Sequence, residues 1–249
     1  MNELDASLDS IFNGKIKLYQ PKEGYRFSED SILLADFSLG IKGLSIDLGT
    51  GCGVIPIIIA MRSKGIEKIY GVEIQERLSY LAKENVKINK LEGRIEIITQ
   101  DIRKLKENFA PQVFDLVISN PPYMQVDRGI ISSASEKAFA RHEILLRIQD
   151  ILNISRYLLK SKGVLKLVYP TMRLVDLFVL MRMRKIEPKR IRLVYYRQDT
   201  PSNIALIEGV KFGKSSLEIL PPLILFNSDG SPTTEYRRIF GLDMMGDEI

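Results

Sequence analysis

The chain has 249 residues, 45% of them hydrophobic and 27% charged, which is typical of a globular protein with one large domain or two small ones. Its formal charge of +5 is compatible with an anionic polymer as partner but does not identify one. A single cysteine, Cys52, excludes an intramolecular disulfide and fits a reducing compartment. The acidic start lacks the features of a signal peptide, and the longest apolar run, Val54 to Met61, is too short to span a membrane. The sequence therefore predicts a cytoplasmic protein that has no membrane partner.

Short β-branched runs alternate with helical patterns along most of the chain. The expected strands are 44–48, 68–74, 94–99, 114–119 and 163–169, and the expected helices are 54–63, 75–89, 142–160 and 172–184. Two further strands, 191–196 and 204–211, have no helix between them, which predicts an antiparallel hairpin at one edge of the sheet. The alternation predicts an α/β fold, with right-handed crossovers and helices on both faces of the sheet.

The organisation predicted for the chain is one domain over residues 1–249. Residues 44–211 form its core, residues 1–43 form an N-terminal flank that completes the ligand pocket, and residues 212–249 form a C-terminal tail. The chain contains no internal repeat and no low-complexity linker.

Polar side chains follow four of the expected strands where each strand ends: Asp47, Glu73, Asp101 and Asn120. In an open parallel sheet, ligands bind beyond the carboxyl ends of the strands. Four consecutive strands therefore deliver a polar group to the same edge, which predicts a ligand site there.

A glycine turn, Asp47-Leu48-Gly49-Thr50-Gly51-Cys52-Gly53, follows the first of these strands. Such a turn lets the backbone approach a ligand closely and begins a helix. The dinucleotide fingerprint is not met, because Val54 stands where its third glycine belongs. Glu73 is placed to accept from both hydroxyls of a ribose, and Asp101 is placed to reach an adenine amino group. The carboxylates disfavour a pyrophosphate and suit a cationic adenosyl ligand, S-adenosylmethionine (SAM).

The tetrapeptide Asn120-Pro121-Pro122-Tyr123 predicts the acceptor side of the site. Its prolines hold Asn120 in an extended conformation and aim the carbonyl of Pro121. These two oxygens can accept both hydrogens of an amino group on a planar ring or amide, which directs the nitrogen lone pair toward a methyl donor. Tyr123 can stack on the ring. These residues would promote methyl transfer by positioning the nitrogen and by electrostatics, so the mechanism requires no side-chain base and no metal.

At this point the motifs resemble a known group. The glycine turn, Glu73, Asp101 and Asn120–Tyr123 resemble the Rossmann-like, SAM-dependent amino methyltransferases, which implies a seven-stranded mixed sheet whose last strand is antiparallel. Segment 24–35, Arg141-His142-Glu143, Pro201-Ser202-Asn203 and the tail from Leu220-Pro221-Pro222-Leu223 are similar to bacterial tRNA(Val) adenine-N6 methyltransferases. That family methylates the adenine beside the anticodon.

The resemblance implies tRNA as the substrate and assigns roles to further residues. Arg141 is expected on the substrate side, and Phe27 and Asp30 near the methionine end of the cofactor or the substrate pocket. The full set expected to bind the cofactor is Asp47, Gly49, Thr50, Gly51, Gly53, Glu73, Ile74, Asp101, Ile102, Asn120, Phe27 and Asp30.

Basic residues gather late in the chain, with Tyr195 and Tyr196 among them. Lysine and arginine contacts to phosphates supply much of the affinity of a protein for nucleic acid. The residues expected to contact RNA are Arg182, Arg184, Lys189, Arg190, Arg192 and Arg197; the alternative is that they form a solvated helix and strand face.

Three alternatives to methylation of an RNA adenine remain open: two concern the acceptor and one concerns the function. The tetrapeptide also suits a glutamine amide, as in protein glutamine-N5 methyltransferases acting on release factors, although these usually carry a helical domain ahead of the glycine turn. A second alternative is a guanine or cytosine amine, for example guanine N2 in rRNA. The third is a non-catalytic RNA-binding module, which the intact motifs disfavour. Residues 124–140 are expected to form a mobile lid over a flipped base, and the sequence leaves the oligomeric state open.

Overall fold

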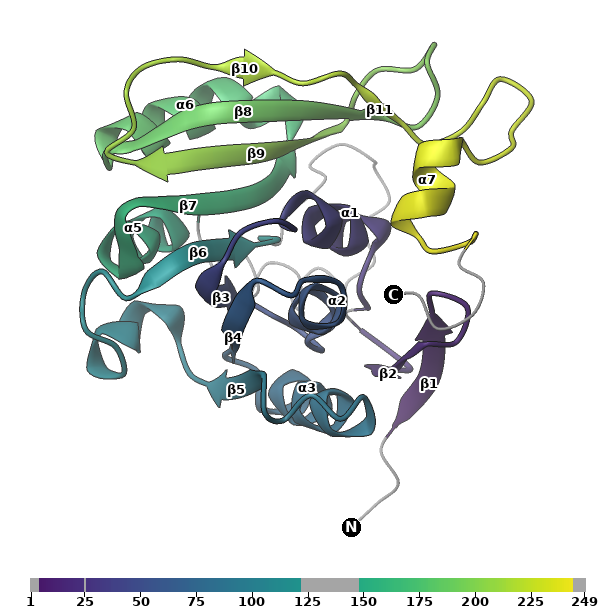
Figure 1. Cartoon of the computed structure of the whole chain (residues 1–249), viewed down its shortest axis with the longest axis horizontal. Helices are drawn as coiled ribbons and strands as arrows, with labels where there is room; N and C mark the ends of the chain where they lie inside the picture. The colour runs from purple at the N-terminus through teal and green to yellow at the C-terminus, as the bar shows by residue number, and fades with distance from the viewer. Residues whose placement is uncertain (1–4, 25, 122–147, 244–249) are drawn as a thin grey trace, which may run out of the picture.

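The computed structural model describes residues 5–24, 26–121 and 148–243, which form a central mixed sheet with helices on both faces (Figure 1). The strands are β1 (Ala6–Ile11), β2 (Ile16–Pro21), β3 (Gly43–Leu48), β4 (Ile66–Glu73), β5 (Ile95–Thr99), β6 (Phe114–Ser119), β7 (Leu159–Pro170), β8 (Ile186–Tyr195), β9 (Ile204–Lys211), β10 (Glu218–Ile219) and β11 (Leu223–Ile224). The helices are α1 (Glu29–Phe37), α2 (Val54–Arg62), α3 (Glu76–Ile88), η1 (Ile102–Glu107), α5 (Ile148–Leu158), η2 (Thr171–Arg173), α6 (Leu174–Met183) and α7 (Thr234–Ile239).

Seven long strands make up the sheet in the order β8-β9-β7-β6-β3-β4-β5. Strands β3 to β7 pair in parallel, and β9 runs antiparallel to both β7 and β8. The predicted mixed sheet with an antiparallel last strand is therefore confirmed. Two short strands from the tail, β10 and β11, extend the sheet by pairing in parallel with β8.

Each face of the sheet has its own apolar core (Figure 1). Helices α1, α2 and α3 cover one face, and α5 and α6 cover the other. The crossovers explain this division: β3, β4 and β5 are added in one direction across the sheet, whereas β6 and β7 are added in the other. Among the described residues, no helix combines the length and the apolar character needed to cross a membrane.

Two expected strands begin at least four residues earlier than the sequence indicated. Strand β8 begins at Ile186 rather than at 191, and Pro188 lies at a register shift in its pairing with β9. A proline is tolerated at such an irregularity because the missing N–H breaks no regular ladder bond. Strand β7 begins at Leu159 rather than at 163, and its pairing with β6 shifts register between Phe114 and Leu116.

The N-terminal flank contains a hairpin that the sequence reading did not assign. Strands β1 and β2 pair antiparallel, and β2 docks on α3. Asn85 of α3 makes this contact: its Oδ1 accepts from the Tyr19 amide at 2.6 Å, and its Nδ2 donates to the Tyr19 carbonyl at 2.9 Å. The same Nδ2 donates to the carbonyl of Cys52 at 2.9 Å. One buried asparagine thus joins the flank, α3 and the glycine turn.

Candidate active site

The glycine turn leaves β3 at the carboxyl end of the sheet. The amides of Gly49 and Thr50 both donate to the carbonyl of Val72 at 2.9 Å, so the turn folds back over β4. Gly49, Gly51 and Gly53 all have positive φ (78°, 58° and 82°), which side-chain-bearing residues rarely adopt. At Gly53 an added Cβ would also approach the Cβ of Ala82 to 3.3 Å. The turn therefore requires glycine for its conformation, as the sequence predicted.

Glu73, at the end of β4, holds the second side of the turn. Its Oε2 accepts from the amide of Gly51, and its Oε1 accepts from the amide of Gln75, each at 2.9 Å. A carboxylate has about four lone-pair positions. Oε1 also accepts from Nε2 of Gln75 at 3.5 Å, so Oε2 of this buried side chain is the oxygen that retains capacity for a second donor, such as a ribose hydroxyl.

Asp47 is fully buried (0% exposed), and neither of its carboxylate oxygens has a hydrogen-bond partner among the described residues. Burial raises the pKa of the Asp47 carboxyl to about 7. The nearby Thr50 hydroxyl acts against this rise in pKa, and the negative charge of Glu73 adds to it. The Thr50 hydroxyl lies close enough to interact electrostatically, but the two groups do not meet in hydrogen-bond geometry. A buried carboxylate without a partner is costly, and a cationic ligand would compensate it.

Asp101, after β5, is engaged by its own chain. Its Oδ1 accepts from the Arg103 amide at 2.9 Å, and the Arg103 guanidinium also contacts the carboxylate, with Nε to Oδ2 at 2.9 Å. The hydrogen bond from Arg103 lowers the pKa of Asp101. The side chain caps η1, so an adenine amino group would share this carboxylate with Arg103.

Asn120 follows β6, and the end of β6 is tied to the end of β3. The Ser119 hydroxyl donates to the carbonyl of Leu48 at 2.7 Å, which places Asn120 beside the glycine turn. Asn120 Nδ2 donates to the hydroxyl oxygen of Ser31 on α1 at 3.0 Å. Because Ser31 engages the amide nitrogen, the amide oxygen is the atom that can accept from a substrate.

The remaining predicted residues lie at different depths around this edge. Ile102 is buried, whereas Ile74 is exposed. Phe27 packs against the core beside α1, and its amide donates to Oε1 of Gln20 at 3.1 Å; Asp30 is in the first turn of α1. Pro121 is buried at the start of the tetrapeptide's proline pair. Pro122, Tyr123, Arg141 and the predicted lid at 124–140 lie outside the described residues.

A family model for the methyltransferase small domain matches residues 29–173, more than half of the chain. The chain belongs to the methyltransferase small domain family. The match includes α1, the glycine turn, Glu73 and Asn120, so the residues that form the site geometry lie inside the methyltransferase domain.

Two curated methyltransferases illustrate the similarity at the level of sequence. Both are named tRNA1(Val) (adenine(37)-N6)-methyltransferase. The protein from Bacteroides thetaiotaomicron is 31% identical over 156 residues, which cover 62% of this chain and 63% of that protein. The one from Proteus mirabilis is 26% identical over 212 residues, which cover 84% of this chain and 82% of that protein. The match to the Bacteroides relative therefore covers less than two thirds of that relative's length.

Solved structures confirm the Rossmann-like methyltransferase fold. A predicted O-methyltransferase from Agrobacterium tumefaciens matches with a TM-score of 0.66 at 19% identity, over 84% of this chain and 94% of that chain. M. jannaschii TYW2, solved in complex with AdoMet, matches with a TM-score of 0.59 at 16% identity, over 86% of this chain and 89% of that chain. At these identities the likeness establishes the fold of the methyltransferase domain and nothing about its substrate.

Most of the basic residues predicted to contact RNA make contacts within the methyltransferase chain. Arg182 pairs with Glu187 at 3.2 Å, Arg184 donates to Oδ1 of Asn153 at 2.7 Å, and Lys189 donates to the carbonyl of Lys214 at 3.0 Å. Arg190 contacts two glutamates, and Arg192 pairs with Glu235 at 2.8 Å. Among the described residues, no partner engages the guanidinium of Arg197, which is exposed in the connection between β8 and β9.

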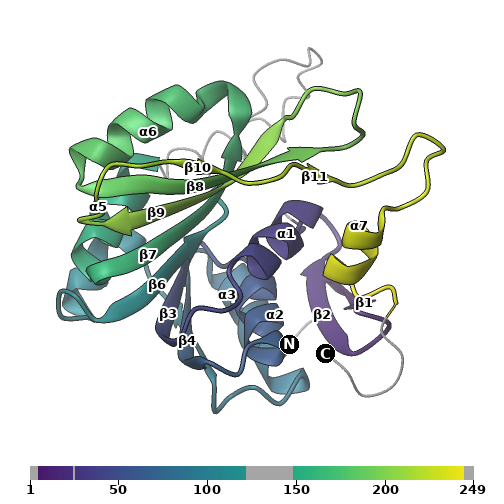
Figure 2. The ribbon, with the colours of Figure 1, turned by 45° about the horizontal axis from the view of Figure 1, so that its top comes forward.

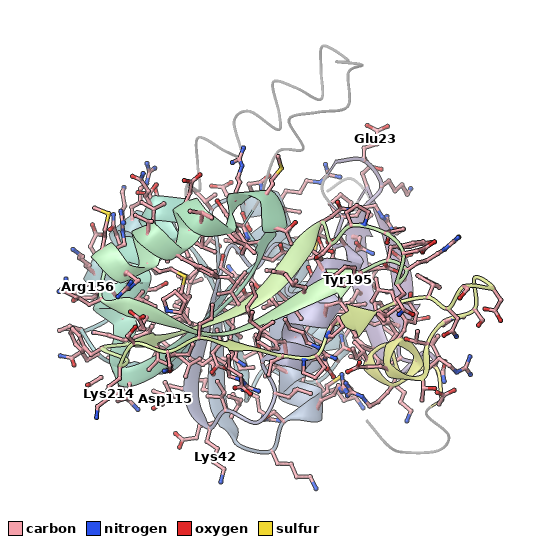
Figure 3. The ribbon with its side chains drawn as sticks, turned by 90° about the horizontal axis from the view of Figure 1, so that it is seen from above. Glu23, Lys42, Asp115, Arg156, Tyr195 and Lys214 are labelled. Atoms are coloured by element: carbon pink, nitrogen blue, oxygen red, sulfur yellow. The ribbon has the colours of Figure 1, made fainter. Side chains whose placement is uncertain are left out.

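The first and last residues of this basic set lie at opposite ends of strand β8. Arg182 and Arg184 precede the start of β8, whose first residue pairs with the last residue of β9. Arg197 follows the carboxyl end of β8, on the side of the glycine turn and Asn120. In Figure 3, Tyr195, the last residue of β8, lies towards one side of the molecule, and Arg156, Lys214 and Asp115 lie towards the other.

Two residues that the sequence reading did not single out position the site. Ser31 is buried (2% exposed) on α1 and holds the amide of Asn120, and Asn85 holds the carbonyl of Cys52 in the glycine turn. Cys52 itself packs against Leu78 and Leu81, and burial raises the pKa of its thiol to about 12, in line with a packing role. The sequence carries no local signal for Ser31 or Asn85, because each partner is far away along the chain.

Proposed function

We propose that this chain transfers a methyl group from SAM to the exocyclic N6 of an adenine in tRNA. The observation that carries the proposal is the fixed orientation of Asn120: Ser31 holds its amide nitrogen at 3.0 Å, and the residue lies beside the glycine turn at the end of β6. The amide oxygen is therefore presented as an acceptor at the edge of the sheet where the cofactor residues gather. The curated relatives named as tRNA1(Val) adenine(37)-N6 methyltransferases support adenine 37 of tRNA1(Val) as the target.

The residues of the glycine turn fit SAM. The unpartnered, buried carboxylate of Asp47 would be stabilised in its ionised form by a positive charge, which the ligand carries. The positive-φ glycines leave backbone exposed to a ligand, and Glu73 retains acceptor capacity for a ribose. The structural neighbours solved with AdoMet and MeSAdo share the same fold. These features support Asp47, Gly49, Gly51 and Glu73 as cofactor-binding residues.

When bound, SAM supplies an electrophilic methyl group. The chain's contribution is to prepare the acceptor: Asn120 Oδ1 accepts one N6 hydrogen and the carbonyl of Pro121 accepts the other. The N6 lone pair, otherwise shared with the ring, is thereby directed at the methyl carbon. With SAM held by the glycine turn and Glu73, N6 would take the methyl group as its bond to sulfur breaks, and the methylated nitrogen would then lose one proton to solvent. Preorganised acceptors of this kind act by positioning and electrostatics, so no side-chain base is needed.

A methyl-transfer assay tests the proposal. The protein is incubated with tritiated SAM in three separate reactions, which contain total tRNA lacking the modification, rRNA or a release factor. The labelled nucleoside is then identified by mass. N6-methyladenosine in tRNA is the expected product. Label on protein alone would indicate a glutamine amide as the acceptor, and N2-methylguanosine would indicate the guanine alternative; either result contradicts the proposal.

The test includes a binding arm, because a methyltransferase domain can lose catalysis and retain RNA binding. Thermal unfolding is measured with and without SAM, since a ligand that binds only the folded state raises the melting temperature. Stabilisation by saturating SAM is expected. If SAM gives no stabilisation while tRNA still binds, the chain is a non-catalytic RNA-binding module.

A further inference from the structure

A second concave site lies away from the predicted cofactor residues. A cavity of about 250 Å³ is enclosed by the C-terminal half of α1, the strands β7 to β9 and the C-terminal tail. Figure 2 shows this tail running along β8 and placing α7 next to α1. Lys166, which lines the cavity, pairs with Ile118 of β6, two residues before Asn120, and so lies roughly 7 Å back along the strands from the level of Asn120. None of the predicted cofactor or acceptor residues lines the cavity, so its side chains are distinct from those of the methyl-transfer site.

The charged lining of the cavity is mostly positive. Lys166, Arg190 and Arg192 line it from the sheet, and Asp36 lines it from α1. The Asp36 carboxylate is already engaged, because Arg62 contacts it at 3.1 Å and Arg238 contacts both of its oxygens at 3.0 Å. It therefore contributes little negative charge to the cavity.

The charges of the surrounding ion pairs do not balance. The cations are Arg62, Lys166, Arg190, Arg192 and Arg238, and the carboxylates that they contact are Asp36, Glu208, Glu218 and Glu235. Five positive groups share four negative ones. One positive charge is left over within a partly enclosed space, where screening by water and salt is weaker than on the open surface.

Arg190 is the cation that its neighbours satisfy least. Its Nη1 reaches Oε2 of Glu208 only at 3.5 Å, and Glu208 is already paired with Lys166 at 2.8 Å. Its Nε lies 3.4 Å from Glu218, within ion-pair distance, yet this buried N–H has no hydrogen-bond partner among the described residues. A guanidinium has five N–H donors in a fixed planar fork that matches phosphate and carboxylate oxygens.

The other two cations are held in place rather than exposed. Lys166 is 3% exposed and donates to the carbonyl of Phe37 at 2.7 Å, with its ammonium 4.0 Å from the centre of the Phe37 ring. Arg192 donates to the carbonyl of Pro221 at 3.0 Å and to Glu235 at 2.8 Å. Their positions are fixed before any ligand arrives, which lowers the entropic cost of binding.

We propose that this cavity binds a phosphate group, with Arg190 as the principal donor and Lys166 and Arg192 as supporting charges. The apolar side chains of Leu33, Phe37, Leu206 and Leu223 form the rest of the wall and suit the organic part of a phosphate ester. The phosphate can belong to a free nucleotide or to an RNA backbone. The proposal does not depend on the methyl-transfer activity, because the cavity is lined by none of the cofactor residues and not by Asn120.

Calorimetric titration of the whole chain with inorganic phosphate, at constant ionic strength in chloride buffer without SAM, tests the site. Arg190→Gln is expected to weaken phosphate binding by about tenfold or more, as befits the loss of a charge-assisted hydrogen bond. Arg182→Gln is the matched control: this arginine pairs with Glu187, is 62% exposed and lies outside the cavity. The control is expected to bind phosphate like the wild type.

A second variant guards against misfolding of the first. Leu220→Phe keeps every charge and fills part of the cavity from the tail, where Leu220 lines it. It is expected to reduce phosphate binding without removing a cation. Absence of phosphate binding to the wild type, or equal binding by wild type, Arg190→Gln and Leu220→Phe, overturns the proposal.

Titrations with AMP and with tRNA on the same three proteins identify the source of the phosphate. Loss of tRNA affinity in both cavity variants assigns the site to a backbone phosphate of RNA. Loss confined to AMP and inorganic phosphate assigns it to a free nucleotide. If binding of inorganic phosphate, AMP and tRNA all fail to respond to the two variants, the cavity is not a phosphate site.

Discussion

The two halves of the sheet use their polar side chains in opposite ways. In the half formed by β3, β4 and β6, Asp47 is buried without a partner, and Glu73 accepts backbone amides with lone pairs to spare. In the half formed by β8 and β9, most charges are engaged by the chain itself, as Arg182 is by Glu187 and Arg192 by Glu235. Arg190, whose Nε has no hydrogen-bond partner among the described residues, is the exception. Charge density alone therefore does not locate a ligand site; side chains that the fold leaves with unused hydrogen-bonding capacity do so better.

The largest expected effect is at Asn120. Asn120→Ala removes the amide oxygen that accepts one N6 hydrogen of the adenine in the proposed mechanism. The rate of methyl transfer is expected to fall by about 10²-fold or more, the scale seen when one preorganised polar group is removed from an active site. Single-turnover kinetics with tritiated SAM measures this. Asn227→Ala, in the tail, is the control and should keep the wild-type rate; near-wild-type transfer by Asn120→Ala with normal SAM binding would show that the mechanism is wrong.

Asp47 gives the next largest effect, on stability. Because the pKa of this carboxyl is raised from 3.8 to about 7 in the folded protein, the folded state holds a proton that the unfolded state releases between these values. The free energy of unfolding should therefore fall as the pH rises from about 4 to about 7, by about 4 kcal/mol from this group at 1.36 kcal/mol per pKa unit.

Urea unfolding at pH 5 and pH 8 without ligand measures this slope in the wild type and in Asp47→Asn, where the contribution should disappear. Asp229→Asn is the control, because the pKa of that carboxyl is lowered and it stays ionised over this range. Affinity for cationic SAM should rise as the pH increases through about 7, since Asp47 then becomes negative. If the free energy of unfolding changes with pH equally in the wild type and in Asp47→Asn, the pKa of Asp47 is not raised by burial in the folded protein.

Ser31 is expected to give a smaller, purely kinetic effect. Ser31→Ala removes one neutral hydrogen bond to Asn120, which contributes about 0.5–1.5 kcal/mol and so about a 2–10-fold decrease in kcat. SAM affinity should not change. Ser38→Ala, at the C-cap of the same helix, is the matched control, since this buried serine donates to the carbonyl of Leu34 and not to the site. In the Asn120→Ala background, Ser31→Ala should have no further effect; an equal loss there would indicate a general packing role.

The smallest effects distinguish the two ends of the basic set. Arg197→Gln should reduce tRNA affinity a few-fold and lower the salt dependence of binding by about one unit, as expected for one phosphate contact. Arg182→Gln should leave tRNA affinity unchanged, because this side chain lies at the opposite edge and pairs with Glu187. Filter binding at several salt concentrations measures both. Equal weakening by the two variants would mean that RNA covers the far edge as well.

The strand ends were predictable because the rule behind them is local. Asp47, Glu73 and Asn120 each follow an apolar run, and parallel strands bring such residues to one edge of the sheet. Ser31 and Asn85 were not predictable in this way. Ser31 meets Asn120 across 89 positions, and Asn85 meets Tyr19 across 66, so that only the packed fold makes them neighbours.

The basic set and the start of β8 illustrate a second limit. A run of arginines has the same pattern whether its partners are phosphates or glutamates, and Glu235, the partner of Arg192, comes 43 positions later in the chain. The early start of β8 was hidden by Pro188, because a proline normally argues against a strand and is tolerated here only at a register shift.

The position of β9 has a consequence for how the protein is made. Strand β8 does not pair with β7; its partners are β9, β10 and β11, all of which follow it in the chain. On the ribosome, where folding proceeds from the N-terminus, β3 to β7 can assemble in order while β8 emerges without a neighbour. Only when residues 204–211 leave the exit tunnel can β9 enter between β7 and β8. The part of the sheet that carries the glycine turn and Asn120 can thus form first, and a nascent chain from which β8 has emerged but residues 204–211 have not leaves β8 as an unpaired edge exposed to chaperones and proteases.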